Sequence, residues 1–382
     1  MDDSILLLIA VVVVALFFDF TNGFHDAANA IATAISTRAL HPRVAVILAA
    51  VLNFAGAFTS FAVAATIAKG IVDPSVITLP ILLAGLIGAT SWNLITWYLG
   101  LPSSSSHALI GGTMGAAIAA NGFGAVFGDG LVQKVLIPSL AAPFLGMAGA
   151  AALMVAFLWI VRRRSPKRVN FAFRRMQLFS SSLLAFTHGT NDAQKTMGII
   201  ALALVASGRL DEDFSRPPIW VIVTAATAIA LGTYAGGWRI IRTLGQRIAK
   251  ISPPQGFAAE AATSITLYLT AHFGFPVSTT HTISGSVLGA GATRGLHAVR
   301  WGVAGNIVTA WLLTIPCAAL VGGLLEVITR IPGGVGPAIV FAIGVAIALL
   351  AFIARSRLMH APAKPAAETQ APPAPATVST GV

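Results

Sequence analysis

Eleven apolar stretches follow one another along this chain of 382 residues, and most of them are long enough to cross a lipid bilayer. A transmembrane helix needs about 20 mainly apolar residues. Only 10% of the chain is Asp, Glu, Lys or Arg, whereas water-soluble domains carry about 25%. An ordinary soluble enzyme and a disordered chain are therefore excluded, and we predict an all-α, polytopic transmembrane helical bundle. The stretches fall near residues 4–35, 44–68, 79–99, 107–120, 135–161, 178–205, 217–236, 256–272, 281–293, 301–328 and 334–354.

Two of these stretches are too short to cross a membrane alone. They follow Pro102 and Pro276, and each has only about 14 apolar residues where a span needs about 20. Segments this short typically re-enter the membrane from one side or meet a partner half-helix. The sequence therefore predicts broken or re-entrant helices at both places.

The basic residues orient the chain in the membrane. Segment 162–177 holds seven Lys and Arg residues and no acidic one, an excess that is typical of cytoplasmic loops. Counting crossings outward from it places 18 of the 24 Lys and Arg residues on the cytoplasmic side. The net charge of +11 is thus mostly an orientation signal, and no nucleic-acid partner is expected. We expect a multi-pass protein of the inner or plasma cell membrane, with its N-terminus outside and its central linker and C-terminus in the cytoplasm.

The chain contains an internal repeat. FTNGFHDAA (20–28) aligns with FTHGTNDAQ (186–194), and GLPSSSSHALIGGTMGA (100–116) aligns with GFPVSTTHTISGSVLGA (274–290). The two pairs occur in the same order at nearly equal offsets, which indicates a duplication. The charge-derived topology makes the two copies run in opposite directions across the membrane. An inverted-topology repeat of this kind is the architecture of many secondary transporters.

The repeat divides the chain into four parts. We expect an N-terminal transmembrane repeat at 1–161, a basic cytoplasmic linker at 162–177, a C-terminal inverted transmembrane repeat at 178–356 and an Ala/Pro-rich tail at 357–382. The tail has no apolar period and is predicted to be disordered.

Two aspartates occupy equivalent positions in the repeat. Asp26 and Asp192 lie among carboxamides and hydroxyls, with Asn22 and Asn29 on the same helical face as Asp26, and Asn191 beside Asp192. Ionisable groups in the bilayer are costly and usually functional. An oxygen cluster with one carboxylate suits a hard monovalent cation, or a proton if burial favours the neutral acid. Asp26 and Asp192 would be metal ligands if sodium is the coupling ion; tying helices together is the structural alternative.

The proline motifs supply the features of an anion site. After each proline a new helix is expected to begin at a hydroxyl cluster, and a helix N-terminus with free N–H groups and hydroxyl donors binds anions. Simple helix capping explains one hydroxyl per helix but not a run of them. The candidate substrate-binding hydroxyls are Ser104, Ser105 and Ser106 in the first copy and Ser278, Thr279 and Thr280 in the second.

Several charged or titratable residues near these motifs are further candidates. His107 and His281 would donate to an anion, carry protons or simply pack. Lys195 would either neutralise Asp192 or reach the anion, and the sequence leaves both open. Asp19 and Glu260 are weaker candidates, because neither has a charged partner in the other copy.

At these motifs the chain resembles the inorganic phosphate transporter (Pit) family, in its bacterial low-affinity permease branch. The resemblance spans roughly 18–356, and family members commonly carry Asn before the Asp in both copies, where this chain has His25 in the first. It implies symport of phosphate, with the Asp motifs and Ser/Thr hairpins forming the site. The motifs are NGFHDAANAIATAISTRAL (22–40), HGTNDAQKTMGI (188–199), GLPSSSSHALIGG (100–112) and FPVSTTHTISG (275–285).

The resemblance implies a secondary active symporter that imports inorganic phosphate, free or as a metal-phosphate complex, coupled to protons or sodium. A sulfate permease on the same scaffold and a passive anion channel are alternatives. We expect no enzyme, since Ser106 beside His107 is not a triad and no G-x-S-x-G motif occurs. No cofactor is expected. The expected partners are phosphate, the coupling cation and the lipid bilayer, and a homodimer is left open.

Overall fold

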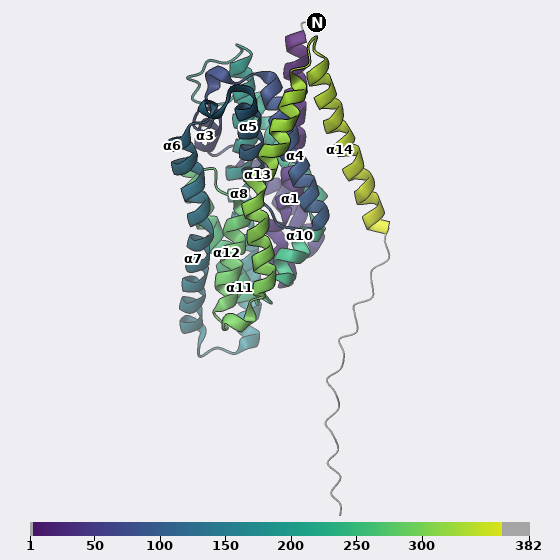
Figure 1. Ribbon diagram of the computed structural model, residues 1–382. Coiled ribbons are helices and arrows are strands. Elements are labelled where there is room, and N and C mark those ends of the chain that lie inside the picture. Colours follow the sequence, from purple (N-terminus) through teal and green to yellow (C-terminus); the bar gives the residue numbers. More distant parts are fainter. Residues whose placement is uncertain (1–2, 361–382) are drawn as a thin grey trace, which may run out of the picture.

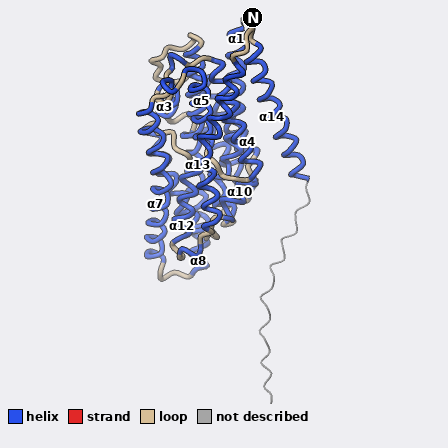
Figure 2. The backbone as a smooth tube through the Cα atoms, viewed as in Figure 1, coloured by secondary structure: helices blue, strands red, loops and turns tan. Residues whose placement is uncertain are grey.

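Helices form nearly all of the regular structure in the computed structural model, which describes residues 3–360. Figures 1 and 2 show one elongated helical bundle with α14 at its edge. No β-strand occurs within residues 3–360, and the only pairings of that kind there are two isolated bridges. The predicted all-α class is therefore confirmed. The prediction of disorder for the tail falls, from residue 361 onward, outside the described residues.

The bounds of the elements follow the apolar pattern closely. The helices are α1 Asp3–Ser36, α2 Pro42–Gly56, α3 Ala62–Lys69, α4 Leu79–Leu99, α5 Ser105–Asn121, α6 Gly128–Gly130, α7 Ile137–Val161, α8 Pro166–Ala206, α9 Ile219–Ala235, α10 Trp238–Arg242, α11 Pro253–His272, α12 Thr279–Ala292, α13 Trp301–Thr329 and α14 Val335–His360. Short 3₁₀ or π turns lie between them: η1 Pro74–Val76, η2 Phe123–Ala125, η3 Leu131–Leu136, η4 Thr243–Arg247 and η5 Leu296–Ala298.

Fewer helices cross a bilayer outright than there are apolar stretches. Within the described residues, five helical segments are long and apolar enough: α1, α4, α7 with the turns before it, α13 and α14. A sixth span forms if α9 and the helix after it, bent by 60°, count as one. Two of the other stretches form the short helices α5 and α12, with 17 and 14 residues. Helices α8 and α11 are longer, with 41 and 20 residues, but are not among the segments that are apolar enough.

The second apolar stretch of each repeat is broken. The sequence predicts one element over 44–68, but the structure divides it into α2 and α3. At the break the Thr59 hydroxyl donates to the Gly56 carbonyl at 2.7 Å and contacts Thr190 on α8 at 2.9 Å. The equivalent stretch of the second repeat bends between α9 and α10. At the first break, the hydroxyls of Thr59 and Thr190 both donate to the Gly56 carbonyl.

Most of the basic segment 162–177 is helical. Helix α8 begins at Pro166, after Ser165 in an extended conformation, and continues without interruption through the second Asp motif. Proline is favourable in the first helical turn, which explains where the helix starts. Phe173 packs against Phe157 and Phe257, with ring centroids 5.3 and 5.6 Å away. These contacts tie the first turns of α8 to the bundle.

Close helix contacts repeat between the two halves. Gly232 on α9 lies so near α1 that a Cβ would overlap the Phe20 carbonyl oxygen, and Gly56 on α2 meets Phe186 of α8 in the same way. Phe20 and Phe186 are equivalent in the sequence repeat. Helix α1 thus crosses α9 as α8 crosses α2.

The re-entrant helices are exchanged between the halves. A Cβ at Gly115 of α5 would overlap the carbonyl of Ala319 on α13, and one at the equivalent Gly289 of α12 would overlap that of Met147 on α7. Each short helix therefore packs on the long helix that follows the short helix of the other repeat. Figure 1 shows α5 in the half of the bundle nearest the N-terminus and α12 in the opposite half. Two hairpins thus enter from opposite ends and meet in the middle.

Candidate functional site

Asp26 and Asp192 lie in the C-terminal halves of α1 and α8, which pack against each other. An oxygen of each carboxylate and a ring nitrogen of His188 all lie within 4.8 Å of one another. The three side chains are at most 2% exposed. Two motifs that are 166 positions apart in sequence therefore form one buried cluster at the interface of the repeats.

The Asp26 carboxylate accepts hydrogen bonds from both hairpins. Ser105 in the first turn of α5 donates to Oδ2 at 2.8 Å, and Thr280 of α12 donates to Oδ1 at 3.3 Å. The Nδ1 atom of His25 lies 2.7 Å from Oδ1, and Asn29 donates to the Thr280 hydroxyl at 2.9 Å. Among the described residues no Lys or Arg pairs with Asp26.

The Asp192 carboxylate has a fixed cation beside it. The Lys195 ammonium forms an ion pair with Oδ1, and Thr279 of α12 donates to the same oxygen at 3.1 Å. Asn191 also donates to Oδ1 at 3.0 Å, and His188 places Nε2 3.2 Å from Oδ2. Lysine and aspartate three residues apart on a helix lie on one face, so the sequence spacing itself places this pair together.

The first turns of α5 and α12 contact the Asp motifs in a repeated pattern. Ser105 and Thr279, which are equivalent in the repeat, each donate to the aspartate of their own half. Thr280 reaches the first motif from the second half, and Ser106 accepts from Lys195 of the second motif. The hydroxyl clusters therefore join both Asp motifs into one network.

Capping and ligand-facing roles are divided among the hydroxyls. Ser104 accepts from the His107 backbone N–H at 3.1 Å and Ser278 accepts from the His281 backbone N–H at 3.3 Å, so one serine caps each helix. The other hydroxyls of each run are not caps and face the Asp motifs. Both helices thus begin at the cluster, where their N-termini contribute partial positive charge.

The two predicted histidines meet each other. The rings of His107 and His281 are perpendicular with centroids 4.7 Å apart. His107 Nε2 lies 2.7 Å from the Ser139 hydroxyl on α7, and the His281 ring stacks on Trp311 of α13 at 4.0 Å. Neither ring has a hydrogen bond to the Asp motifs within the described part of the chain. Both side chains lie on the side of the hairpins that faces α7 and α13.

Two buried amide oxygens at the cluster have no hydrogen-bond donor among the described residues. They are Oδ1 of Asn29 and Oδ1 of Asn191, whereas Asn22 lies beside Asp19. Buried polar atoms in proteins are almost always paired, and hard cations bind carboxylate and amide oxygens. This donor set fits a hard monovalent cation such as sodium.

Sequence reasoning missed His188 and Asn53. His188 bonds through Nδ1 to Asn53 Oδ1 at 3.0 Å, and Asn53 in turn donates to Thr233 at 2.7 Å. The repeat alignment pairs His188 with Asn22, so each copy carries one histidine and one asparagine in exchanged positions. This exchange of residue types between the two copies is the sequence feature that could have identified His188. No sequence pattern relates Asn53 to the motifs.

Glu260 belongs to a separate cluster nearer the end of the bundle where α8 begins. It accepts hydrogen bonds from Thr33 at 2.6 Å, from Gln177 at 3.1 Å and from Ser180. Its carboxyl therefore has donors from α1 and α8, and it ties these two helices to α11.

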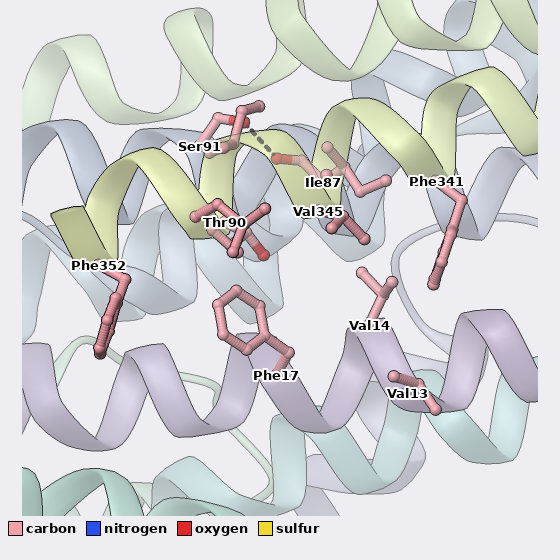
Figure 3. Close-up of a pocket in the computed structure, with 13 residues that line it drawn as sticks. Val13, Val14, Phe17, Ile87, Thr90, Ser91, Phe341, Val345 and Phe352 are labelled. Atoms are coloured by element: carbon pink, nitrogen blue, oxygen red, sulfur yellow. Dashed lines mark hydrogen bonds between the residues drawn. The ribbon is translucent and has the colours of Figure 1, made fainter.

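The most prominent pockets of the structure lie elsewhere. One of about 400 Å³ is formed by α1, α4 and α14, and Figure 3 shows its apolar lining, with Phe17, Phe341 and Phe352 around it. The Ser91 hydroxyl at its edge donates to the Ile87 carbonyl at 2.6 Å, so it is already satisfied. This groove offers nothing to a charged solute.

The fold and this cluster together define a class: a helical membrane protein in which two inverted repeats bring re-entrant helix N-termini and paired aspartates to one buried polar centre. The comparison with known families agrees. The chain belongs to the phosphate transporter family, whose sequence profile matches residues 22–322.

Curated relatives that match this chain over most of their length are described as phosphate transporters. A protein of Mycobacterium bovis described as a probable low-affinity inorganic phosphate transporter is 53% identical over 344 residues, covering 88% of this chain and 81% of that protein. One of Rhizobium meliloti with the same description is 50% identical over 319 residues, covering 83% and 95%. These relatives are transporters and not enzymes, as expected from the sequence.

A solved structure has the same fold. The structure titled the sodium-dependent phosphate transporter matches with a TM-score of 0.78 and 25% sequence identity, over 86% of this chain and all of that chain. The arrangement of helices described above is therefore that of a known phosphate transporter.

Proposed function

We propose that this chain imports inorganic phosphate by symport with cations, through alternating access at the cluster of Asp26 and Asp192. One observation carries the proposal. Two helix N-termini with spare hydroxyls and two duplicated carboxylates share one buried site. The helix N-termini and their hydroxyls favour an anion, and the two carboxylates favour cations.

Binding of the anion depends on binding of the cation. Helix N-termini and hydroxyls bind phosphate oxygens, but a carboxylate a few ångströms away repels them. Phosphate is therefore held only when positive charge has entered the cluster first or enters with it. Coupling then follows from binding itself, since neither ion is stable at the site without the other.

The membrane potential also favours transport of phosphate together with cations. Moving one negative charge inward against 100 mV, inside negative, costs about 2.3 kcal/mol. A divalent phosphate crossing alone would carry twice that penalty, and each co-transported cation removes one share of it. In the proposed orientation the N-terminus lies outside and the start of α8 lies in the cytoplasm, which is the side favoured by its basic residues.

The test is uptake of radiolabelled phosphate by the purified chain in liposomes. Gradients of pH, sodium and divalent metal are imposed separately, with unlabelled phosphate or sulfate as competitor. We expect uptake to be driven by a cation gradient and to be blocked by phosphate more than by sulfate. Uptake that ignores every cation gradient would indicate a channel, and sulfate-selective uptake would indicate the sulfate permease; either result contradicts the proposal.

Matched variants separate the site from the scaffold. Asp26→Asn and Asp192→Asn should each abolish uptake, whereas Asp129→Asn, an exposed aspartate in a connection, should leave it unchanged. Normal uptake by either site variant would overturn the assignment of the two carboxylates.

A further inference from the structure

Asp19 is the one aspartate of the described bundle interior whose carboxylate oxygens lack hydrogen bonds of normal geometry. It is 0% exposed, and the Thr196 and Asn22 side chains lie beside it without forming such bonds. The other buried carboxylates differ sharply: Asp26, Asp192 and Glu260 each accept bonds from at least two side chains. An unpaired buried carboxylate is costly, so Asp19 needs a partner that the protein itself does not supply.

The neighbours of Asp19 are also oxygen atoms without partners. Asn22, three residues on and on the same face of α1, and Thr196 of α8 lie beside its carboxyl. Asn22 Oδ1 and Thr196 Oγ1 are buried and accept no hydrogen bond among the described residues. Two carboxylate oxygens, one amide oxygen and one hydroxyl oxygen therefore lie close together between α1 and α8.

The charges around this space leave Asp19 without a countercharge. Asp192 and Lys195 of α8 lie within electrostatic range of it. An ammonium has three donors, and those of Lys195 are taken by Asp192, Ser106 and the Val277 carbonyl. Helices α4 and α9, which flank α1, contain no acidic, basic or histidine residue.

We propose that Asp19, Asn22 and Thr196 form a second cation site, for a hard monovalent metal ion such as sodium, separate from the central cluster. The donor set is entirely oxygen and carries one negative charge, which suits such an ion. A single proton bridges only two oxygens and would leave the others of the set unpaired, whereas a metal ion contacts all of them at once.

The site lies nearer the N-terminus of α1 than the central cluster does. Asp19 precedes Asp26 by seven residues on one helical face, which is about 10 Å along the axis. The equivalent position in the second repeat is Ala185, so this site is not duplicated. It rests on the proposed function: a cation here supplies, next to the central cluster, a further positive charge to balance a divalent phosphate.

The test is binding of radiolabelled sodium to the purified full chain in detergent. Asp19→Asn removes the charge at nearly constant shape, and Thr196→Val removes one ligand oxygen. We expect the first to abolish one sodium-binding component and the second to weaken it about tenfold. The controls are Asp129→Asn, an exposed aspartate, and Thr113→Val, a buried threonine on α5 whose hydroxyl is likewise unpaired; both should bind sodium as the unmodified chain does.

Unchanged sodium binding in Asp19→Asn and Thr196→Val overturns the site. So does an Asp19→Asn variant that alters only the pH dependence of phosphate uptake, because Asp19 would then be a proton carrier. Phosphate uptake by the unmodified chain is measured on the same preparation. Failure of that uptake refutes the proposed function, and the sodium measurement decides the site independently of it.

Discussion

The two Asp motifs occupy equivalent places in the inverted repeats, yet their charges are balanced differently. Asp192 is paired with Lys195, a charge that is part of the chain. At the position equivalent to Lys195 the first copy has Asn29, and Asp26 has only His25 and hydroxyl donors. The duplication thus places both aspartates in similar surroundings. In the second copy, Lys195 at the position of Asn29 balances the negative charge of the aspartate.

This difference assigns the mobile cation to one side. A carboxylate with a built-in ammonium needs no further positive charge, whereas the Asp26 carboxylate does. The orphaned oxygen of Asn29 lies on the same helix face as Asp26. We infer that the coupling cation binds at Asp26 and that Asp192 with Lys195 shapes the other wall of the phosphate site.

The largest expected effect is the loss of transport in Asp26→Asn. Removing a buried charge from a paired site typically costs 2–5 kcal/mol, so phosphate uptake should fall about 100-fold or more. Because no fixed cation loses a partner, thermal unfolding in detergent should remain close to that of the unmodified chain. A variant that unfolds before it can be reconstituted would show that Asp26 is structural.

The second copy should respond differently to the same change. Asp192→Asn leaves the Lys195 ammonium buried without its carboxylate, and breaking such a pair costs about 3–5 kcal/mol of stability. The unfolding temperature should drop clearly. Asp192→Asn combined with Lys195→Met should recover the stability but not the uptake. If Asp192→Asn is as stable as Asp26→Asn, the two copies are not distinguished by charge in the way described.

Equivalent hydroxyls should matter equally. Ser105→Ala and Thr279→Val each remove one donor to an aspartate, and a hydrogen bond to a charged group is worth about 1.5–3 kcal/mol. We expect phosphate affinity, measured by calorimetry, to weaken at least about tenfold in both. Thr227→Val, on an exposed part of α9, serves as the control. An effect confined to one of the pair would mean that a single hairpin binds the anion.

The smallest effect is expected at His25. The second copy has Asn191 at the equivalent position, so His25→Asn makes the two motifs alike there. Uptake should stay within about fivefold of normal, whichever cation gradient drives it. A loss of uptake as large as that of Asp26→Asn would show that His25 is part of the coupling site.

How far the sequence predicts the structure can be judged from these same residues. The re-entrant hairpins could be predicted, because a proline followed by hydroxyl residues and a short apolar run is compatible with few other structures in a membrane. The pairing of Lys195 with Asp192 was readable as one alternative, because helix spacing fixes which residues share a face.

Other features depend on contacts between distant segments and could not be read in this way. At the break, Thr59 contacts Thr190 of α8, and the first turns of α8 are held to the bundle by Phe173 packing against two other aromatic rings. Likewise, Asn53 reaches His188 only because α2 and α8 cross closely at glycines. Such contacts become visible only when the fold is known.

The central claim is that cation and phosphate bind the shared cluster only together, with the mobile cation at Asp26. The most direct measurement is the phosphate dissociation constant of the purified chain, by calorimetry, as sodium concentration and pH are varied one at a time. We predict that phosphate affinity rises at least about tenfold with one of these cations, and that Asp26→Asn removes this dependence. A phosphate affinity that is the same at every sodium concentration and every proton concentration, after correction for the charge state of phosphate itself, would contradict the account.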